Sequence, residues 1–143
     1  MKTREKRYWI GVACLNHINR GLELGMFGIG HGKLEPLERM QPNDMILFYA
    51  PKIDFAKNDK ANIYQKFKGF GEITNDEIFT EEISDRCVFR RKVRFLSNKE
   101  VDIHELIGEL DFIKDKKRWG FPFMRGYLEI TEKDFATVSK SLK

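Results

Sequence analysis

Basic and aromatic side chains lie next to one another between Asp111 and Gly126, in the stretch DFIKDKKRWGFPFMRG. Lysine and arginine neutralise phosphates, and aromatic faces stack on any nucleobase. The stretch therefore predicts contact with nucleic acid, but a solvated loop held to a core by its rings would have the same composition. Its basic residues run directly into its aromatic ones; they are Lys114, Lys116, Lys117 and Arg118, followed by Trp119, Phe121 and Phe123.

A second candidate is the glycine-rich stretch MFGIGHGK, residues 26 to 33. Glycines at alternate positions let the backbone approach a ligand closely or adopt positive φ. The stretch is not a phosphate-binding P-loop, because Gly32-Lys33 is followed by Leu34. It is not a dinucleotide fingerprint either, because Pro36 and Pro42 leave no room for the long helix that such a motif opens. We expect it to line a binding site of another kind.

Residues typical of enzymes form no recognisable constellation. His17, His31 and His104 lack metal-ligand spacing, so no metal or other cofactor is expected. Cys14 and Cys87 lie in apolar strand patterns, which predicts reduced, inert core thiols. Paired carboxylates occur only in polar stretches that water would solvate. The sequence therefore predicts no catalytic residue.

Composition indicates one globular domain over residues 1–143. Hydrophobic residues make up 41% of the 143 positions, enough for a proper core, and the formal net charge is +4. This mild excess of positive charge permits nucleic-acid binding without requiring it. The sequence has no apolar run of signal or membrane-spanning length, so we expect a cytoplasmic protein with no membrane partner.

Strands outnumber helices in the expected order of elements. Residues 8–14, apolar on both alternation phases, predict a central strand, and Asn16 is expected to cap a short helix. Further strands are expected at 45–49, 64–73, 87–96 and 127–130, with a bulge near Gly69 and Gly71. A turn at 97–99, a helix starting at Asp102 and a last helix capped by Thr131 complete the pattern.

These elements do not alternate regularly, which indicates an α+β fold with a mixed or antiparallel curled sheet. In the strand at 87–96, Arg90, Lys92 and Arg94 share a basic phase. Arg91 falls on the apolar phase, where its charge needs a carboxylate, a ligand or a bulge that turns it outward.

Five segments taken in order resemble an EVE domain, a family of the PUA-like superfamily related to the YTH domain. The resemblance covers almost the whole chain; the segments are YWI from Tyr8, HGKLEPLERMQPND from His31, FKGFGEI from Phe67, FIKDKKRWGFPF from Phe112 and LEITEKDF from Leu128. It implies an open, curled mixed β-barrel flanked by short helices, with a pocket for one extruded base. EVE domains are associated with modified cytosines in DNA, whereas YTH domains read a methylated adenine in RNA, and neither is an enzyme.

The resemblance also implies roles for individual residues. Phe27 takes the place of a tryptophan that is common in YTH pockets, and its smaller ring would stack less strongly on a base. The expected base pocket contains Trp9, Asn16, Phe27, Gly28, Ile29, His31, Lys33, Tyr49, Phe121 and Phe123. The expected phosphate contacts are Arg90, Arg91, Lys92, Arg94, Lys114, Lys116, Lys117, Arg118 and Arg125.

The sequence therefore predicts a non-catalytic module that recognises a modified base, a modified cytosine in DNA, by base flipping. An RNA-binding PUA-like module and a nucleoside- or small-molecule-binding enzyme are the alternatives. Because a module that only binds a base carries out no reaction on it, we expect a separately encoded effector such as a nuclease, or an oligomeric partner. The sequence leaves the oligomeric state open.

Overall fold

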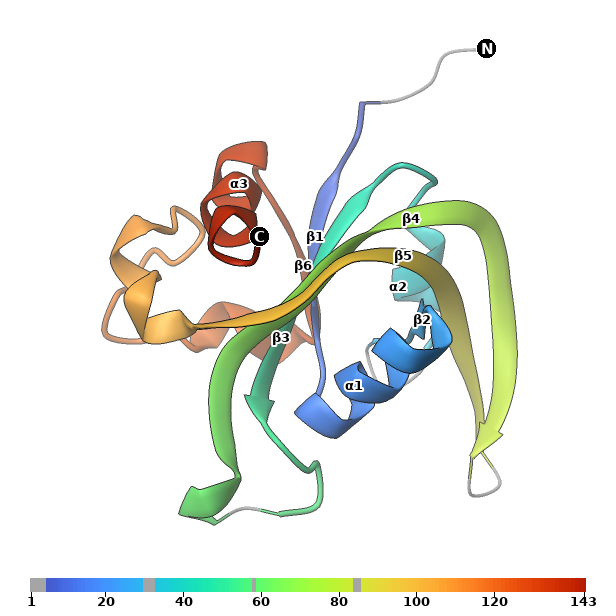
Figure 1. The fold of residues 1–143 in the computed structure, drawn as a ribbon, viewed down its shortest axis with the longest axis horizontal. Helices are drawn as coiled ribbons and strands as arrows, with labels where there is room; N and C mark the ends of the chain where they lie inside the picture. The colour runs from blue at the N-terminus through green and yellow to red at the C-terminus, as the bar shows by residue number, and fades with distance from the viewer. Residues whose placement is uncertain (1–4, 30–32, 58, 84–85) are drawn as a thin grey trace.

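The protein forms one six-stranded mixed sheet with short helices around it (Figure 1). The computed structural model describes residues 5–29, 33–57, 59–83 and 86–143. The strands are β1 (Tyr8–Val12), β2 (Met26–Phe27), β3 (Met45–Lys52), β4 (Ile63–Ile83), β5 (Arg86–Asp102) and β6 (Tyr127–Ile130). The α-helices are α1 (Leu15–Leu24), α2 (Leu34–Glu38) and α3 (Glu132–Ser141). The 3₁₀ helices are η2 (Lys60–Asn62), η3 (Ile103–Glu105), η4 (Ile107–Glu109) and η5 (Phe121–Arg125).

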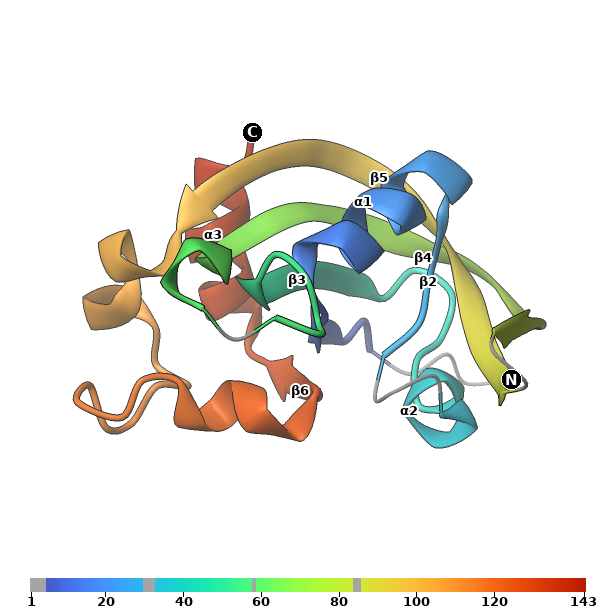
Figure 2. The ribbon, with the colours of Figure 1, turned by 90° about the horizontal axis from the view of Figure 1, so that it is seen from below.

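The strand order is β2-β5-β4-β3-β1-β6, with β1 parallel to β3 and every other pair antiparallel. The long strands β4 and β5 lie side by side and bend together over the other strands (Figures 1 and 2). In the described part of the chain the end strands β2 and β6 do not pair, so the barrel stays open. The predicted α+β fold with an open, curled mixed sheet is confirmed.

The sheet separates two hydrophobic clusters, and β1 contributes to both. Ile10 packs in the first cluster with Phe67, Phe123 and the apolar residues of α3. Its neighbour Trp9 packs in the second cluster with Phe27 and residues of α1 and α2. Because successive side chains of a strand point to opposite faces, this confirms that both faces of β1 are covered.

Several local predictions are confirmed. Gly69 has a φ of 77° and lies where the β4–β5 register shifts, as expected of a bulge. Thr131 caps α3 by accepting a hydrogen bond from Asp134 N at 3.1 Å. Gly25 ends α1 in the left-handed conformation at a φ of 68°.

Other local predictions are wrong. Asn16 lies inside α1, whose N-cap is Cys14, and its own N–H donates to Ile53 O at 3.0 Å. The expected turn at 97–99 is part of β5, where Ser97 pairs with Phe70 of β4. Asp102 does cap a helix, but the expected α-helix consists of the 3₁₀ helices η3 and η4, because its backbone hydrogen bonds join residues three apart. Cys87 is exposed rather than a core thiol.

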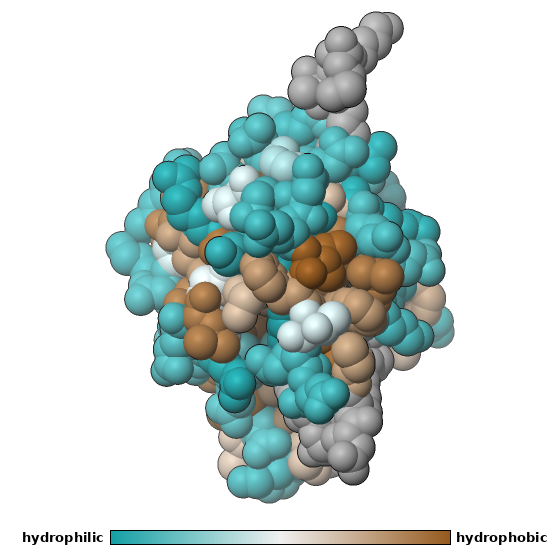
Figure 3. Space-filling model, turned by 90° about the vertical axis from the view of Figure 1, so that its right-hand side faces the viewer, coloured by the Kyte–Doolittle hydropathy of each residue, from teal (hydrophilic) through white to brown (hydrophobic). Residues whose placement is uncertain are grey.

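On the right-hand side of Figure 1, apolar side chains reach the surface between hydrophilic ones (Figure 3). Within the described residues, no helix is both long and apolar enough to cross a membrane.

Candidate functional site

A pocket of about 730 Å³ lies between the β1–β6 pair, the 112–125 segment and the end of α2. This volume is in the range of small-molecule and cofactor sites, roughly 300–1,000 Å³. Aromatic lining comes from Trp9, Phe112, Phe121 and Tyr127. Basic lining comes from Arg7, Arg39, Lys114, Arg118 and Arg125. The pocket therefore joins the two chemistries that the 111–126 stretch suggested, with contributions from distant parts of the chain.

The floor of the pocket is one face of the β1–β6 pair. Trp9 is in register with Glu129, and Gly11 is in register with Tyr127. Since side chains alternate along a strand, Trp9, Glu129 and Tyr127 share a face, and Arg7 lies on it as well. The Arg7 Nε and Glu129 Oε2 atoms are 3.7 Å apart across this face.

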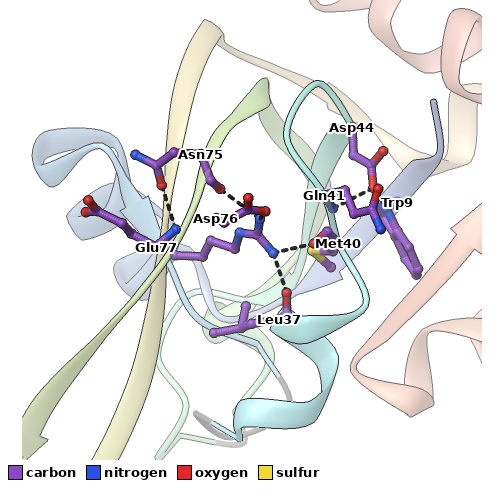
Figure 4. A network of polar contacts seen from close by, with 9 residues as sticks. Trp9, Leu37, Met40, Gln41, Asp44, Asn75, Asp76 and Glu77 are labelled. Carbon is purple, nitrogen blue, oxygen red and sulfur yellow. Dashed lines mark hydrogen bonds and ion pairs between the residues drawn. The ribbon is translucent and has the colours of Figure 1, made fainter. Parts of the chain in front are cut away.

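A buried carboxylate fixes the orientation of Trp9. The Trp9 indole Nε1 donates a hydrogen bond to Asp44 Oδ2 at 2.9 Å (Figure 4). Asp44 also accepts from the backbone N–H groups of Arg7 and Gln41, both at 3.0 Å. Its side chain thus joins the start of β1, the floor residue Trp9 and the turn before β3.

The wall formed by residues 111–126 is held at several points. Asp134, at the start of α3, accepts from the backbone N–H groups of Asp111 and Phe112 at 2.9 Å each. Phe123 stacks on Tyr49 with ring centroids 4.1 Å apart and planes 18° from parallel. At the far end Gly126, at a φ of 84°, ends η5, and its carbonyl accepts from Val12 N at 2.9 Å. The wall is a fixed structure rather than a loose loop.

Positive charge predominates in the pocket. Among the residues that the structure describes, its lining holds five basic residues and two carboxylates, those of Asp115 and Glu129. Asp115 is engaged locally, because its Oδ1 accepts from the Lys117 N–H at 3.0 Å and from the Arg118 N–H at 3.4 Å. Lys114, Arg118 and Arg125 are exposed. An anionic ligand would meet cations on several sides.

The described part of the glycine-rich stretch packs on the same face of β1. Ile29 is buried in the cluster that contains Trp9. It lies so close to Gly11 that a Cβ there would come within 2.8 Å of Ile29 Cγ2. Phe27 is 4% exposed and meets Phe48 edge-on, with centroids 5.4 Å apart. Lys33 is exposed. His31 lies outside the described residues, and its expected contact with a base stays a prediction.

A small cluster of ionisable side chains, Arg90, Glu81 and His17, lies next to Gly28. A Cβ on Gly28 would lie 2.4 Å from Arg90 Nη1 and 2.9 Å from the backbone carbonyl oxygen of Phe89, so a larger residue would require the backbone as well as the guanidinium to shift. The Arg90 Nη2 and Glu81 Oε1 atoms are 3.8 Å apart. Burial lowers the pKa of the nearby His17 below its ordinary value, and the positive charge of Arg90 acts in the same direction. Burial also lowers the pKa of Arg90, against the effect of Glu81.

The predicted base-pocket residues are distributed over four places. Trp9 and Phe121 line the pocket. Tyr49 and Phe123 are stacked on each other in the first hydrophobic cluster, and Phe27 and Ile29 are buried in the second. Asn16 is exposed on α1.

The basic residues of β5 do not reach the pocket lining. Arg90 and Arg91 are 8% and 2% exposed. Arg94 donates to Glu72 Oε1 at 2.9 Å, and the Lys92 ammonium lies over the Phe79 ring at 5.3 Å. On the 111–126 wall, Lys116 donates to Leu110 O at 2.8 Å, and Lys117 is exposed. The pocket thus gathers Lys114, Arg118 and Arg125 from the predicted phosphate contacts.

Arg91 has the partners that its place on the apolar phase requires. Its Nη1 donates to the carbonyls of Leu37 and Met40, and its Nη2 donates to Asn75 O at 2.7 Å; these three acceptor residues are labelled in Figure 4. Asp76 Oδ1 lies 3.6 Å from Nη2. Arg91 is therefore a buried structural cation that connects α2 and the residues after it to β4 and β5.

Sequence reasoning missed Arg7, Arg39, Tyr127 and Glu129 as pocket residues. Arg7 stands two places before Trp9, so strand alternation alone indicates that the two share a face. Tyr127 and Glu129 join them only through the β1–β6 register, and Arg39 only through the position of α2. These long-range contacts leave no local signal.

Comparison with known proteins gives both a family and a fold. A sequence model described as the EVE domain matches residues 7–141. A UPF0310 protein of Bacillus licheniformis is 38% identical over 128 residues, which are 89% of this chain and 85% of that protein. A UPF0310 protein of Mycolicibacterium gilvum is 34% identical over 135 residues, 94% of each chain.

Two similar solved structures are YTH domains. The YTH domain of the Zygosaccharomyces rouxii MRB1 protein, in complex with N6-methyladenosine RNA, has a TM-score of 0.64 and 14% identity. The match covers 99% of this chain and 89% of that one. A complex of the YTH domain-containing protein mmi1 with RNA has a TM-score of 0.63 and 10% identity, covering 96% of this chain and 82% of that one. At these identities the likeness describes the fold.

Proposed function

The chain belongs to the EVE domain family, and from this premise we propose that it is a non-catalytic module that binds nucleic acid and recognises a modified base. The observation that carries the proposal is the pocket in which, within the described chain, Trp9 and Tyr127 meet five basic side chains. A base needs an aromatic surface and its flanking phosphates need cations, and both requirements are met within one cavity. The YTH domain complex with N6-methyladenosine RNA supports this function.

In the proposed complex the base is turned out of the strand and enters the pocket against Tyr127 and the edge of Trp9. Lys114, Arg118 and Arg125, on the exposed wall, contact the phosphates on either side. Glu129, in register with Trp9, supplies an acceptor for an exocyclic amino group, which cytosine and adenine both carry. We propose a modified cytosine in DNA as the base, in keeping with the family resemblance.

The second candidate ligand is modified RNA. It is favoured by one observation: both YTH domains described above are RNA complexes. Single-stranded RNA would present its base without an opening cost, and the same cations would hold its phosphates.

In either case the module needs an effector to act on what it binds, and we propose a separately encoded one such as a nuclease, working with it in the cytoplasm.

A binding panel tests the function. Fluorescence anisotropy would be measured on matched oligonucleotides with unmodified, methylated, hydroxymethylated and bulkier cytosines, in DNA and in RNA, together with N6-methyladenosine RNA. One modified base should bind at least about tenfold more tightly than its unmodified counterpart, the scale of one well-placed polar contact. Lys114→Ala should weaken binding to every oligonucleotide about equally, because phosphate contacts are independent of sequence. Lys140→Ala, an exposed lysine of α3, is the matched control. Equal affinity across the panel would remove the proposal.

A further inference from the structure

Two large apolar side chains stand out from the wall of the pocket. Phe121 is 71% exposed and Met124 is 81% exposed, the two highest values among the large hydrophobic residues of the described chain. Both belong to η5, three residues apart (residues 121–125, orange in Figure 2). In a 3₁₀ helix, side chains three residues apart project on the same side, so the two form one apolar projection.

The structure holds this projection in place. Phe123, between the two exposed residues, is 5% exposed and stacked on Tyr49. The helix is closed by Gly126 in the left-handed conformation and tied to β1 through Val12. Because Phe123 anchors η5 in the core, the side chains of Phe121 and Met124 project outward from a fixed helix rather than from a flexible loop.

Cations surround the projection. Arg118 precedes it and Arg125 follows it, and both line the pocket together with Phe121. Exposed phenylalanine and methionine between arginines suit a surface that is apolar at its centre and anionic at its edges. A stack of bases between two phosphate backbones has this character, and proteins that open base steps insert side chains such as Phe, Leu and Met.

We propose that Phe121 and Met124 form a wedge that enters the base stack of a duplex at the place left by the base taken into the pocket. The inference rests on the proposed function and makes it more specific, because a single-strand reader needs no wedge. Extruding a base leaves a gap whose neighbouring bases have lost their stacking. Phe121, at the rim of the pocket, and Met124 beside it would fill that gap with apolar surface while Arg118 and Arg125 hold the backbone.

The test compares a duplex carrying one modified cytosine with the same strand alone. Phe121→Ala together with Met124→Ala should weaken binding to the duplex about tenfold and to the single strand by about twofold or less. Phe121→Leu should retain most of the duplex affinity, because a wedge requires apolar volume whereas stacking requires an aromatic face. A 2-aminopurine next to the modified cytosine should brighten when wild-type protein binds, and less so with the double variant.

Phe55→Ala is the matched control, since Phe55 is 64% exposed but lies between β3 and η2. It should leave duplex binding unchanged, and thermal unfolding should show that all variants remain folded. Equal losses on duplex and single strand would assign Phe121 to stacking and overturn the wedge, as would binding confined to single strands. Unchanged duplex binding in the double variant, with loss of binding to anionic vesicles, would overturn it in favour of a membrane contact. In each of these cases the proposed function would stand, whereas no binding to any oligonucleotide would remove both.

Discussion

At the scale of single residues, the pocket floor depends on Asp44. This side chain is 1% exposed and accepts hydrogen bonds from Trp9 Nε1, Arg7 N and Gln41 N. A buried carboxylate is costly unless such donors satisfy it, and its loss leaves each of these donors without this acceptor. The indole of Trp9 would then lose its fixed orientation, and with it the shape of the floor.

Asp44→Ala should therefore lower the free energy of unfolding by about 3 kcal/mol, because leaving a buried donor unsatisfied costs roughly 1 to 3 kcal/mol. Asp44→Asn should cost less, since its amide oxygen still accepts. Urea denaturation measures the change. The control is Asp59→Ala, an exposed aspartate whose side chain makes no cap hydrogen bond, expected within about 0.5 kcal/mol of wild type. Similar values for Asp44→Ala and Asp59→Ala would show that the network does not stabilise the fold.

At the scale of elements, Arg91 connects α2 to the long hairpin formed by β4 and β5. Its guanidinium donates hydrogen bonds to the carbonyls of Leu37 and Met40, in and after α2, and to the carbonyl of Asn75 in β4. Arg39, which lines the pocket, lies between Leu37 and Met40 in the sequence. The position of this pocket residue thus depends on a guanidinium buried behind it.

Replacing Arg91 by leucine should destabilise the protein by roughly 3 to 5 kcal/mol, as removal of one partner from a buried charged network usually does. Arg91→Lys should not restore stability, because one ammonium cannot match the planar fork of a guanidinium. Arg94→Leu, on the same strand but with its side chain 64% exposed, should cost about 1 kcal/mol or less. Chemical denaturation measures the free energy of unfolding of the three variants. Comparable losses of stability for Arg91→Leu and Arg94→Leu would contradict the role of Arg91.

The same elements show how far the sequence determines the fold. The covering of both faces of β1, the bulge at Gly69 and the Thr131 cap are local properties, and the sequence predicts each of them. The strain of placing Arg91 on an apolar phase was also visible, but its carbonyl partners come from residues 16 to 54 positions away. The sequence predicts the aromatic run 119–123, but its division into a buried Phe123 and an exposed Phe121 depends on Tyr49 of β3, a distant part of the chain.

At the scale of the whole molecule, the pocket carries a local excess of positive charge. The chain has a formal net charge of +4, and the described part of the pocket lining holds five basic residues against two acidic ones. Charge gathered in this way raises the local concentration of an anionic ligand and orients its approach. It also makes affinity sensitive to salt, since phosphate contacts release counterions.

The logarithm of the association constant should therefore fall linearly with the logarithm of salt concentration. Arg118→Ala with Arg125→Ala should reduce the slope by about 2, near one for each lost phosphate contact. Replacing Lys57 and Lys60, both exposed in the chain between β3 and β4, should leave it unchanged. Anisotropy titrations at several salt concentrations measure the slopes. A slope near zero for wild type would indicate an uncharged ligand such as a free nucleoside.

The tryptophan in the pocket floor also makes the protein its own optical probe. The chain has two tryptophans, and Trp119, which is not among the described lining residues, lies edge-on to His104 with ring centroids 5.2 Å apart. Trp9 is 3% exposed and hydrogen-bonded to a carboxylate, so its emission depends on the polarity and hydration of the cavity beside it. With Trp119 replaced by phenylalanine, the remaining tryptophan fluorescence would come from the pocket floor alone. Occupation of the pocket could then be followed without labelling either the protein or its ligand.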